Sequence, residues 1–250
     1  MKGIRSFLLA VQFLTRLPVP LRGAPHDSEI GGSVLFYPLV GLLIGTVLAG
    51  AAIVANVVHV PGVLGGAILL AIWVLVTGGL HLDGLADSVD AWAGGRGGRE
   101  RTLALMKDPH CGPMAVSALI VVLLVKFASL AVLAASGHRL LIMLAPVLGR
   151  TALPPLLLTT PYVRPGGLGS AMSAYLNRAA AIVIVLTACG IVVGAFGTAG
   201  LSATMIATAV FVLLRRMMIA RIGGTTGDTA GALVELVETV VVAVAAAFCR

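Results

Sequence analysis

Three aspartates recur at helical spacing in the segment HLDGLADSVD, which ends at Asp90. Asp83, Asp87 and Asp90 are spaced i, i+4 and i+7, so on a helix they share one face about 10 Å long, at ~1.5 Å per residue. Carboxylates on one face repel each other unless a cation neutralises them. Because Mg²⁺ is commonly held by a few carboxylates together with substrate phosphates, this spacing indicates a magnesium-dependent site.

A second acidic stretch, GGTTGDTAGALVELVE, ends at Glu238. Asp228 follows a glycine turn, and Glu235 and Glu238 lie on one helical face further along. Both glutamates fall within an apolar run, where carboxylates are costly and commonly functional. Two interpretations stay open. In the first, these acids complete the metal site. In the second, the glutamates pair with Arg150 or Lys126, which also lie within predicted helices.

A basic, glycine-rich loop lies between the two acidic stretches. Its residues are Gly94, Gly95, Arg96, Gly97, Gly98, Arg99 and Arg101, followed by Lys107. Backbone amides and guanidinium groups of this kind bind phosphate well. Taken alone, the loop equally fits a segment that only sets membrane orientation. Beside the acids, it indicates metal-assisted phosphoryl transfer at a membrane surface.

The composition determines which elements must position these residues. Apolar residues make up 59% of the 250 residues and charged residues 11%, with a mean hydropathy of +1.07. A globule of this size cannot bury so many apolar side chains, so the composition excludes a soluble enzyme, a disordered chain and a DNA-binding domain. We therefore expect an all-α, polytopic helical bundle within a membrane. Three scattered cysteines imply no disulfide framework.

Seven apolar runs have the length of about 20 residues that a ~30 Å hydrocarbon core requires. They lie at 33–58, 61–82, 114–136, 140–160, 179–199, 201–220 and 230–249. The fourth run contains Arg150 and three prolines, so we expect it to be kinked or broken. Only Phe196–Gly200 is available as a turn between the fifth and sixth runs. No repeat or linker divides the chain, so residues 1–250 are predicted to form a single domain.

The first residues have an amphipathic pattern ahead of these runs. Over residues 3–17, one helical stripe is apolar, and the opposite side carries Arg5, Gln12 and Arg16. The pattern suits a helix that lies in the membrane interface and ends before Pro18. A first helix packed within the bundle fits equally well.

Basic residues are distributed unevenly between the two predicted sides of the membrane. With the N-terminus inside, the cytoplasmic segments are 1–32, 83–113, 161–178 and 221–229. Together with Arg215 and Arg216 at an inner helix end, they hold all but four of the 17 basic residues, whereas the opposite loops hold only Arg139. This positive-inside pattern predicts that both acidic stretches face the cytoplasm. It also explains the net positive charge without a nucleic-acid partner.

Motifs spread in order along nearly the whole chain resemble the cobalamin synthase family, the adenosylcobinamide-GDP ribazoletransferases. They are FLTRLPVP, FYPLVGLLIG, GGLHLDGLADSVDA, LMKDPHCG, the segment around Arg150 and GGTTGDTAGA. The HLDGLADSVD motif is the most specific of these. Ala91 and Ala115 stand where glycine is usual in the family, and both are small substitutes.

The resemblance implies a Mg²⁺-dependent transferase of the bacterial or archaeal cytoplasmic membrane, which acts late in the biosynthesis of adenosylcobalamin. A ribose hydroxyl of α-ribazole, or of its 5′-phosphate, attacks the corrin-proximal phosphorus of adenosylcobinamide-GDP, and GMP leaves. The residue pattern and the resemblance together predict these catalytic residues: Asp83, Asp87, Asp90 and Asp228. The predicted metal ligands are the same four residues and Glu238. The predicted substrate-binding residues are His81, Arg96, Arg99, Lys107, Asp108, Arg150 and Arg221. Membrane lipid is an expected partner. The sequence leaves the oligomeric state open, and an oligomer is compatible with it.

Two other functions remain as alternatives. A CDP-alcohol phosphotransferase also places aspartates around an Asp-Gly pair, but Asp87 stands where that pattern requires arginine. An ion or metabolite transporter would line a pathway with buried acids, yet such proteins usually contain repeated halves and mid-membrane sites. This chain has no such repeat, and its aspartates gather at one predicted surface. Release of GMP from both substrates would separate the transferase from a transporter.

Overall fold

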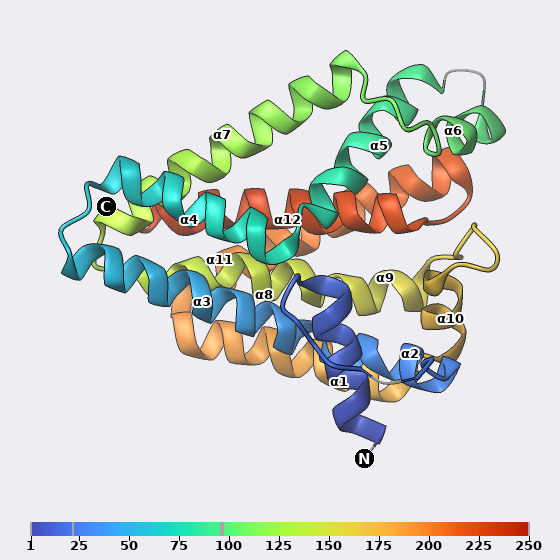
Figure 1. Ribbon diagram of the computed structural model, residues 1–250, viewed down its shortest axis with the longest axis horizontal. Helices are drawn as coiled ribbons and strands as arrows, with labels where there is room; N and C mark the ends of the chain where they lie inside the picture. The colour runs from blue at the N-terminus through green and yellow to red at the C-terminus, as the bar shows by residue number, and fades with distance from the viewer. Residues whose placement is uncertain (1, 22, 96–97, 250) are drawn as a thin grey trace.

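The computed structural model describes residues 2–21, 23–95 and 98–249, and across these ranges every regular element is helical. Figure 1 shows long helices lying side by side, with shorter helices gathered at one end. In chain order the elements are α1 (Lys2–Leu14), α2 (Asp27–Ser33), the 3-10 helix η1 (Val34–Phe36), α3 (Tyr37–Val57), α4 (Gly62–Thr77), α5 (Leu80–Gly94), α6 (Arg99–Leu105), α7 (Pro113–Ala135), the 3-10 helix η2 (Arg139–Met143), α8 (Leu144–Thr151), α9 (Leu153–Thr159), α10 (Leu168–Tyr175), α11 (Arg178–Ile222) and α12 (Gly227–Ala247). The all-α prediction is confirmed.

Within the described ranges, five helical segments are long and apolar enough to cross a membrane. They are Asp27–Val57, Pro113–Ala135, Arg139–Thr159, Arg178–Ile222 and Gly227–Ala247. The bent pair α4 and α5 adds a sixth crossing if it is taken as one span. Only 11% of the most apolar part of α11 is buried, so its side chains face outward as those of a lipid-facing helix do. The chain is a multi-pass membrane protein.

Helix α11 covers both the fifth and the sixth predicted run. Its 45 residues would span ~68 Å at ~1.5 Å per residue, more than twice a hydrocarbon core. Gly197 interrupts it with φ 55° and ψ −128°, and Gly200 packs against the carbonyl of Val192. That contact is impossible in a straight helix, because residues eight apart are separated by ~12 Å. The two halves therefore fold back on each other (Figure 1), and the turn predicted at Phe196–Gly200 is confirmed.

The predicted run 61–82 is wrong in its last residues. Helix α4 ends at Thr77, and α5 begins at Leu80 after a bend of 87°. Gly78 and Gly79 both have positive φ, 64° and 70°, a conformation that glycine adopts without a steric penalty. The three aspartates therefore lie outside α4, the helix that forms most of this run. They lie on a separate helix that turns away from the bundle axis (Figure 1).

The fourth predicted run is divided, as expected. It consists of η2, α8 and α9, with Ala152 between the last two. The N-terminal helix α1 packs against the bundle along one side. Val11 and Leu14 are buried against the bundle, whereas Ile4 is 70% exposed.

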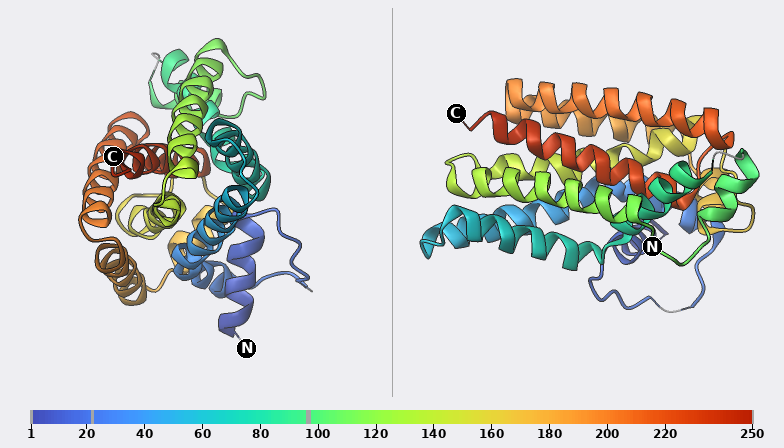
Figure 2. Two further views of the ribbon diagram at one scale, coloured as in Figure 1. Left: turned by 90° about the vertical axis from the view of Figure 1, so that its left-hand side faces the viewer. Right: turned by 90° about the horizontal axis from the view of Figure 1, so that it is seen from above.

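The connecting segments separate into two groups at opposite ends of the bundle. Figures 1 and 2 show α5, α6 and α10 at one end, together with the turn between α11 and α12. The turn after α3, the turn after α7 and the point where α11 folds back lie at the other end (Figure 1). This arrangement agrees with the predicted division of loops between two membrane sides. It also brings both acidic stretches to the same end.

Candidate functional site

The three aspartates of α5 share one cavity, as their spacing predicted. Asp83, Asp87 and Asp90 line a polar cavity of about 550 Å³, together with Arg16 and His110. No hydrogen bond or ion pair of the described residues involves the carboxylates of Asp83 or Asp87. These two acids are therefore free to receive a ligand.

Asp228 reaches the same region because α5 and α12 pack unusually closely. A Cβ atom on Gly84 would lie 2.6 Å from the backbone oxygen of Asp228, and one on Gly231 would lie 3.5 Å from the Cα of Gly84. Glycine at position 84 is therefore required for this approach, which explains the Asp-Gly pair of the motif. As a result, Asp83 and Asp228 line a second, smaller cavity of about 290 Å³.

The glycine and threonine residues before Asp228 build the turn that positions it. Gly223 ends α11 with φ 73°, and Thr225 pairs with the segment after α9. The N–H of Thr225 donates to the Pro161 carbonyl at 2.8 Å, and Val163 N–H donates to the Thr225 carbonyl at 2.9 Å. Thr226 then caps α12, because its hydroxyl accepts from the N–H of Thr229 at 3.2 Å. The motif thus fixes Asp228 in the first turn of α12.

Arg164 is a site residue that the sequence did not predict. Its Nη1 lies 2.6 Å from Oδ2 of Asp228, and both side chains are only partly exposed. The pairing of Thr225 with Tyr162 brings Arg164 to this position. In the sequence, Arg164 is one of several basic residues in a predicted cytoplasmic loop, and no spacing connects it to Asp228. The Arg-Pro-Gly-Gly sequence that begins at Arg164 was the only local signal.

Asp90 has a structural partner. Its carboxylate accepts hydrogen bonds from the N–H of Gly112 at 2.5 Å and of Ala115 at 2.9 Å, at the start of α7. A carboxylate at a helix N-terminus satisfies free N–H groups and interacts favourably with the helix dipole. Asp90 therefore anchors the loop before α7 to α5. A metal ion held by Asp90, as predicted, would share the carboxylate with these two hydrogen bonds.

Glu238 and Arg150 belong to a buried ion-pair network. Arg150 is fully buried and pairs with Glu238, while Lys126 Nζ lies 2.9 Å from Oε2 of Glu238 and 2.5 Å from Oε1 of Glu235. His81 faces the same network, with Nδ1 3.3 Å from Nη2 of Arg150. The interpretation of the glutamates as partners of Arg150 and Lys126 matches these contacts. Glu238 and Arg150 therefore have protein partners within this network, and the metal-binding role of Glu238 and the substrate-binding role of Arg150 stay predictions.

Arg221 also makes structural contacts. Its Nε donates to the hydroxyl of Thr102 at 3.1 Å, and its Nη2 donates to the carbonyl of Trp92 at 3.2 Å. It therefore holds α6 against the end of α5. Arg99 is exposed at the start of α6, with its guanidinium near Gly223.

The remaining predicted substrate-binding residues lie at the edge of the site. Lys107 is exposed. Asp108 is also exposed and pairs with His110, whose Nδ1 lies 2.6 Å from Oδ1 of the aspartate. Hydrogen bonds from His110 hold the pKa of the Asp108 carboxyl below its usual value. Arg96 lies outside the described residues.

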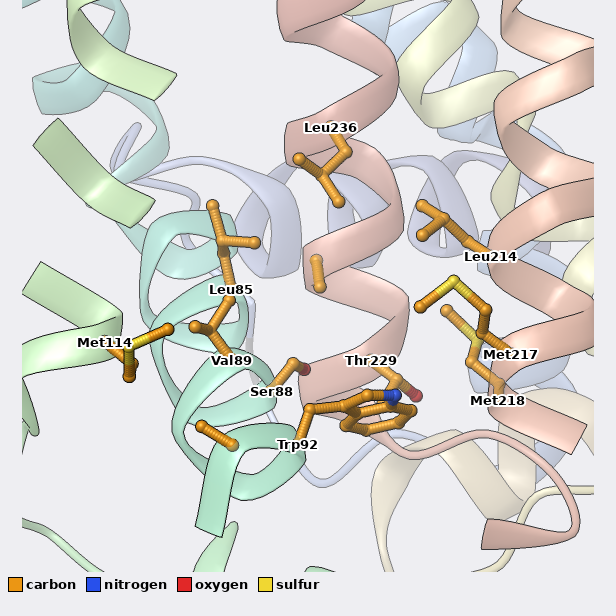
Figure 3. A pocket seen from close by; sticks show the side chains of 12 residues that line it. Leu85, Ser88, Val89, Trp92, Met114, Leu214, Met217, Met218, Thr229 and Leu236 are labelled. Atoms are coloured by element: carbon orange, nitrogen blue, oxygen red, sulfur yellow. The ribbon is translucent and has the colours of Figure 1, made fainter. Parts of the chain in front are cut away.

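The opposite face of α5 is apolar. Figure 3 shows a pocket of about 420 Å³ in which Leu85, Val89 and Trp92 of α5 face Leu214 and Met217 of α11. At ~100° per residue, these α5 positions lie on the far side of the helix from the aspartates. The acids therefore do not open into this pocket.

A magnesium ion fits the donors of the polar cavity. No group of three or more His, Cys, Asp or Glu side chains forms a ready metal cluster within the described part of the chain. Mg²⁺ is, however, usually bound by one or two carboxylates, water and substrate phosphates. Asp83 and Asp87 supply two carboxylates of this kind on one helix face.

Comparisons with known proteins agree with this arrangement. A family model described as cobalamin-5-phosphate synthase matches residues 6–246. Relatives from Pseudomonas paraeruginosa PA7 and Pseudomonas aeruginosa PAO1 are 52% identical over 240 residues, which cover 96% of this chain and 97% of theirs. A relative from Pseudomonas fluorescens Pf-5 is 52% identical over 238 residues, covering 94% and 96%. All three are named adenosylcobinamide-GDP ribazoletransferase, and no solved structure matches the chain.

These matches extend over the helices that carry both acidic stretches. They include the turn that positions Asp228 and the loop that carries Arg164. The resemblance inferred from the sequence motifs is confirmed. The chain belongs to the cobalamin-5-phosphate synthase family.

Proposed function

We propose that this chain is a magnesium-dependent adenosylcobinamide-GDP ribazoletransferase. The observation that carries the proposal is the position of Asp83, which lines both a large polar cavity and a smaller cavity that it shares with Asp228. A carboxylate between two cavities suits a reaction in which two substrates must meet. The names of the 52% identical relatives supply the identity of these substrates.

The reaction joins a ribose hydroxyl of α-ribazole, or of its 5′-phosphate, to the corrin-proximal phosphorus of adenosylcobinamide-GDP. A new oxygen–phosphorus bond forms, the bond between this phosphorus and the GMP oxygen breaks, and GMP leaves. Asp228 accepts the proton of the attacking hydroxyl. Asp83 and Asp87 would hold Mg²⁺, which supplies positive charge beside the phosphates. Arg164 orients the Asp228 carboxylate by its ion pair.

We further propose that the chain resides in the cytoplasmic membrane with this site facing the cytoplasm. Loops rich in Lys and Arg lie at the same end of the bundle as the site, which the positive-inside rule favours. The outward apolar side chains of α11 would contact membrane lipid. Membership of the family argues against both the CDP-alcohol phosphotransferase and the transporter alternatives.

The direct test is GMP release by the purified protein in detergent. Both substrates are supplied with Mg²⁺, and parallel reactions omit one substrate or contain a chelator of divalent cations. We expect GMP only in the complete reaction, and restored release when excess Mg²⁺ follows the chelator. GMP formation that does not depend on α-ribazole would indicate hydrolysis and would contradict the proposal. Unchanged release in the chelator would contradict the magnesium requirement alone.

A further inference from the structure

We propose that the smaller cavity binds the nucleoside acceptor and that the larger polar cavity binds the pyrophosphate of the activated substrate. This inference rests on the proposed function and assigns each substrate to one cavity. The two cavities have Leu80 and Asp83 in common, so ligands in both would meet at Asp83.

The walls of the smaller cavity suit a flat aromatic base. Phe13 and Tyr37 line it and stack on each other, with ring centroids 6.4 Å apart and planes inclined by 17°. Tyr162 forms another part of the wall. Aromatic side chains bind the π-face of a base in stacked or edge-on contacts, each contributing about 1–3 kcal/mol. The base of α-ribazole, a fused aromatic ring, matches this surface.

The charges of the smaller cavity point to an uncharged ligand that donates hydrogen bonds. Among the described residues, its lining includes Asp83 and Asp228 but neither lysine nor arginine. Arg164 already pairs with Asp228 from outside this lining, and Asp83 has no cationic partner among the described residues. A pyrophosphate would therefore be repelled by Asp83, whereas ribose hydroxyls can donate hydrogen bonds to both carboxylates. The volume of about 290 Å³ is near the lower limit of ~300 Å³ for pockets that hold drug-sized molecules. That space suits a nucleoside and is too small for a corrin.

The larger cavity has the complementary properties. It measures about 550 Å³ and is lined by Arg16 and His110 as well as the α5 aspartates. The side chain of Arg16 lies directly against Gly78, where any Cβ atom would collide with it. The glycine pair that bends α4 away from α5 therefore also gives Arg16 its place beside the acids. A guanidinium next to a carboxylate pair that can hold Mg²⁺ is the chemistry that binds a pyrophosphate.

Substitutions in the smaller cavity and in the apolar pocket on the other side of α5 test the assignment. Phe13→Leu removes an aromatic ring from the smaller cavity at a position that is 39% exposed, so the fold should tolerate it. Gly227→Val adds volume at the edge of the same cavity, where a Cβ atom would meet only the Tyr162 hydroxyl, at 3.8 Å. Trp92→Leu is the matched control, because it removes an aromatic ring from the apolar pocket on the other face of α5 (Figure 3).

The measurements are the KM for each substrate and, separately, equilibrium dialysis of α-ribazole with the protein alone. We expect both cavity variants to raise the KM for α-ribazole about tenfold, or ~1.4 kcal/mol, with the KM for adenosylcobinamide-GDP unchanged. Saturable α-ribazole binding should weaken to a similar extent, and Trp92→Leu should alter neither quantity.

The dialysis separates this inference from the proposed function. If the wild-type protein releases no GMP, the proposed function fails. Weaker α-ribazole binding by Phe13→Leu than by the wild-type protein in dialysis would still support the smaller cavity as the nucleoside site. If the wild-type protein is active but both cavity variants keep its KM for α-ribazole, the assignment of the cavity is overturned. A higher KM for α-ribazole in Trp92→Leu, with Phe13→Leu unaffected, would instead place the base on the other face of α5 and overturn it as well.

Discussion

Arg164 and Asp228 form an ion pair in which Nη1 lies 2.6 Å from Oδ2, although the two residues come from different segments of the chain. The pair joins the loop after α9 to the first turn of α12. Because Asp228 lies next to the other carboxylates of the site, a neighbouring guanidinium offsets part of their mutual repulsion. The position and charge of Asp228 therefore depend on a residue that the acidic motifs do not include.

Replacing Arg164 tests this dependence. In Arg164→Gln, Asp228 loses the partner that positions it, so we expect kcat to fall about 100-fold, as when a catalytic group is misplaced by ~1 Å. Arg164→Lys keeps the charge without the planar fork and should fall less. GMP release measured at saturating substrates gives kcat. Arg178→Gln removes a charge from an exposed position nearby in sequence and should stay close to wild type. Equal activity of Arg164→Gln and Arg178→Gln would contradict the role of Arg164.

Asp83 should be the most sensitive of the acids, because it lines both cavities. Asp83→Asn keeps the volume and removes the charge, so we expect activity to fall at least ~100-fold, as for a group that stabilises charge in the transition state. Asp27→Asn, at an exposed position in the first turn of α2, is the matched control. Wild-type activity in Asp83→Asn, with an unchanged Mg²⁺ requirement, would disprove its assignment.

Asp87 and Asp90 should behave differently, although both belong to the same motif. Asp90→Asn retains an oxygen that can accept from the start of α7, so it should keep most activity, whereas Asp90→Ala should lose about 1 kcal/mol of stability, the usual cost of a lost helix cap. Asp87→Asn should raise the Mg²⁺ concentration that gives half-maximal activity. Thermal unfolding and Mg²⁺ titration of GMP release measure the two effects. A shift of the Mg²⁺ requirement in Asp90→Asn as large as in Asp87→Asn would show that Asp90 is a metal ligand.

Local features of the structure could be predicted from the sequence. Apolar runs gave the long helices, and the i, i+4, i+7 spacing placed Asp83, Asp87 and Asp90 on one face, because both patterns depend on one segment at a time. The turn at Gly197 followed from a gap between two runs. The partners of Glu238 could be named as one of two alternatives, since few basic residues lie within apolar helices.

Features that depend on distant segments could not be predicted. A pair of glycines allows the bend at Gly78, but its direction is set by the packing of α5 on α12. The partners of Asp90 become known only when the start of α7 is placed beside α5. The contact between Arg164 and Asp228 depends on backbone pairing of Thr225 with another loop. These contacts decide which charged residues line the site and which support it.

The orientation in the membrane can be tested with a native cysteine. Cys111 is exposed beside the aspartate cavity, whereas Gly137 follows α7 at the other end of the bundle. In a variant that keeps Cys111 as its single cysteine, we expect reaction with an impermeant maleimide in inverted vesicles and none in intact spheroplasts. A single cysteine introduced by Gly137→Cys should show the opposite pattern. Labelling of both cysteines from the same side would contradict the separation of the loops, and a full reversal would place the site outside.

The buried network offers a test that separates structure from metal binding. Glu238→Gln leaves Arg150 and Lys126 buried beside fewer negative charges, and breaking a buried pair costs about 3–5 kcal/mol, so we expect a much lower thermal unfolding temperature. Adding Lys126→Met to Glu238→Gln removes the excess cation and should recover part of that loss. The fraction of each variant that remains folded should need the same Mg²⁺ concentration for half-maximal GMP release as the wild-type protein. If Glu238→Gln instead kept the wild-type unfolding temperature and required more Mg²⁺, Glu238 would be a metal ligand after all.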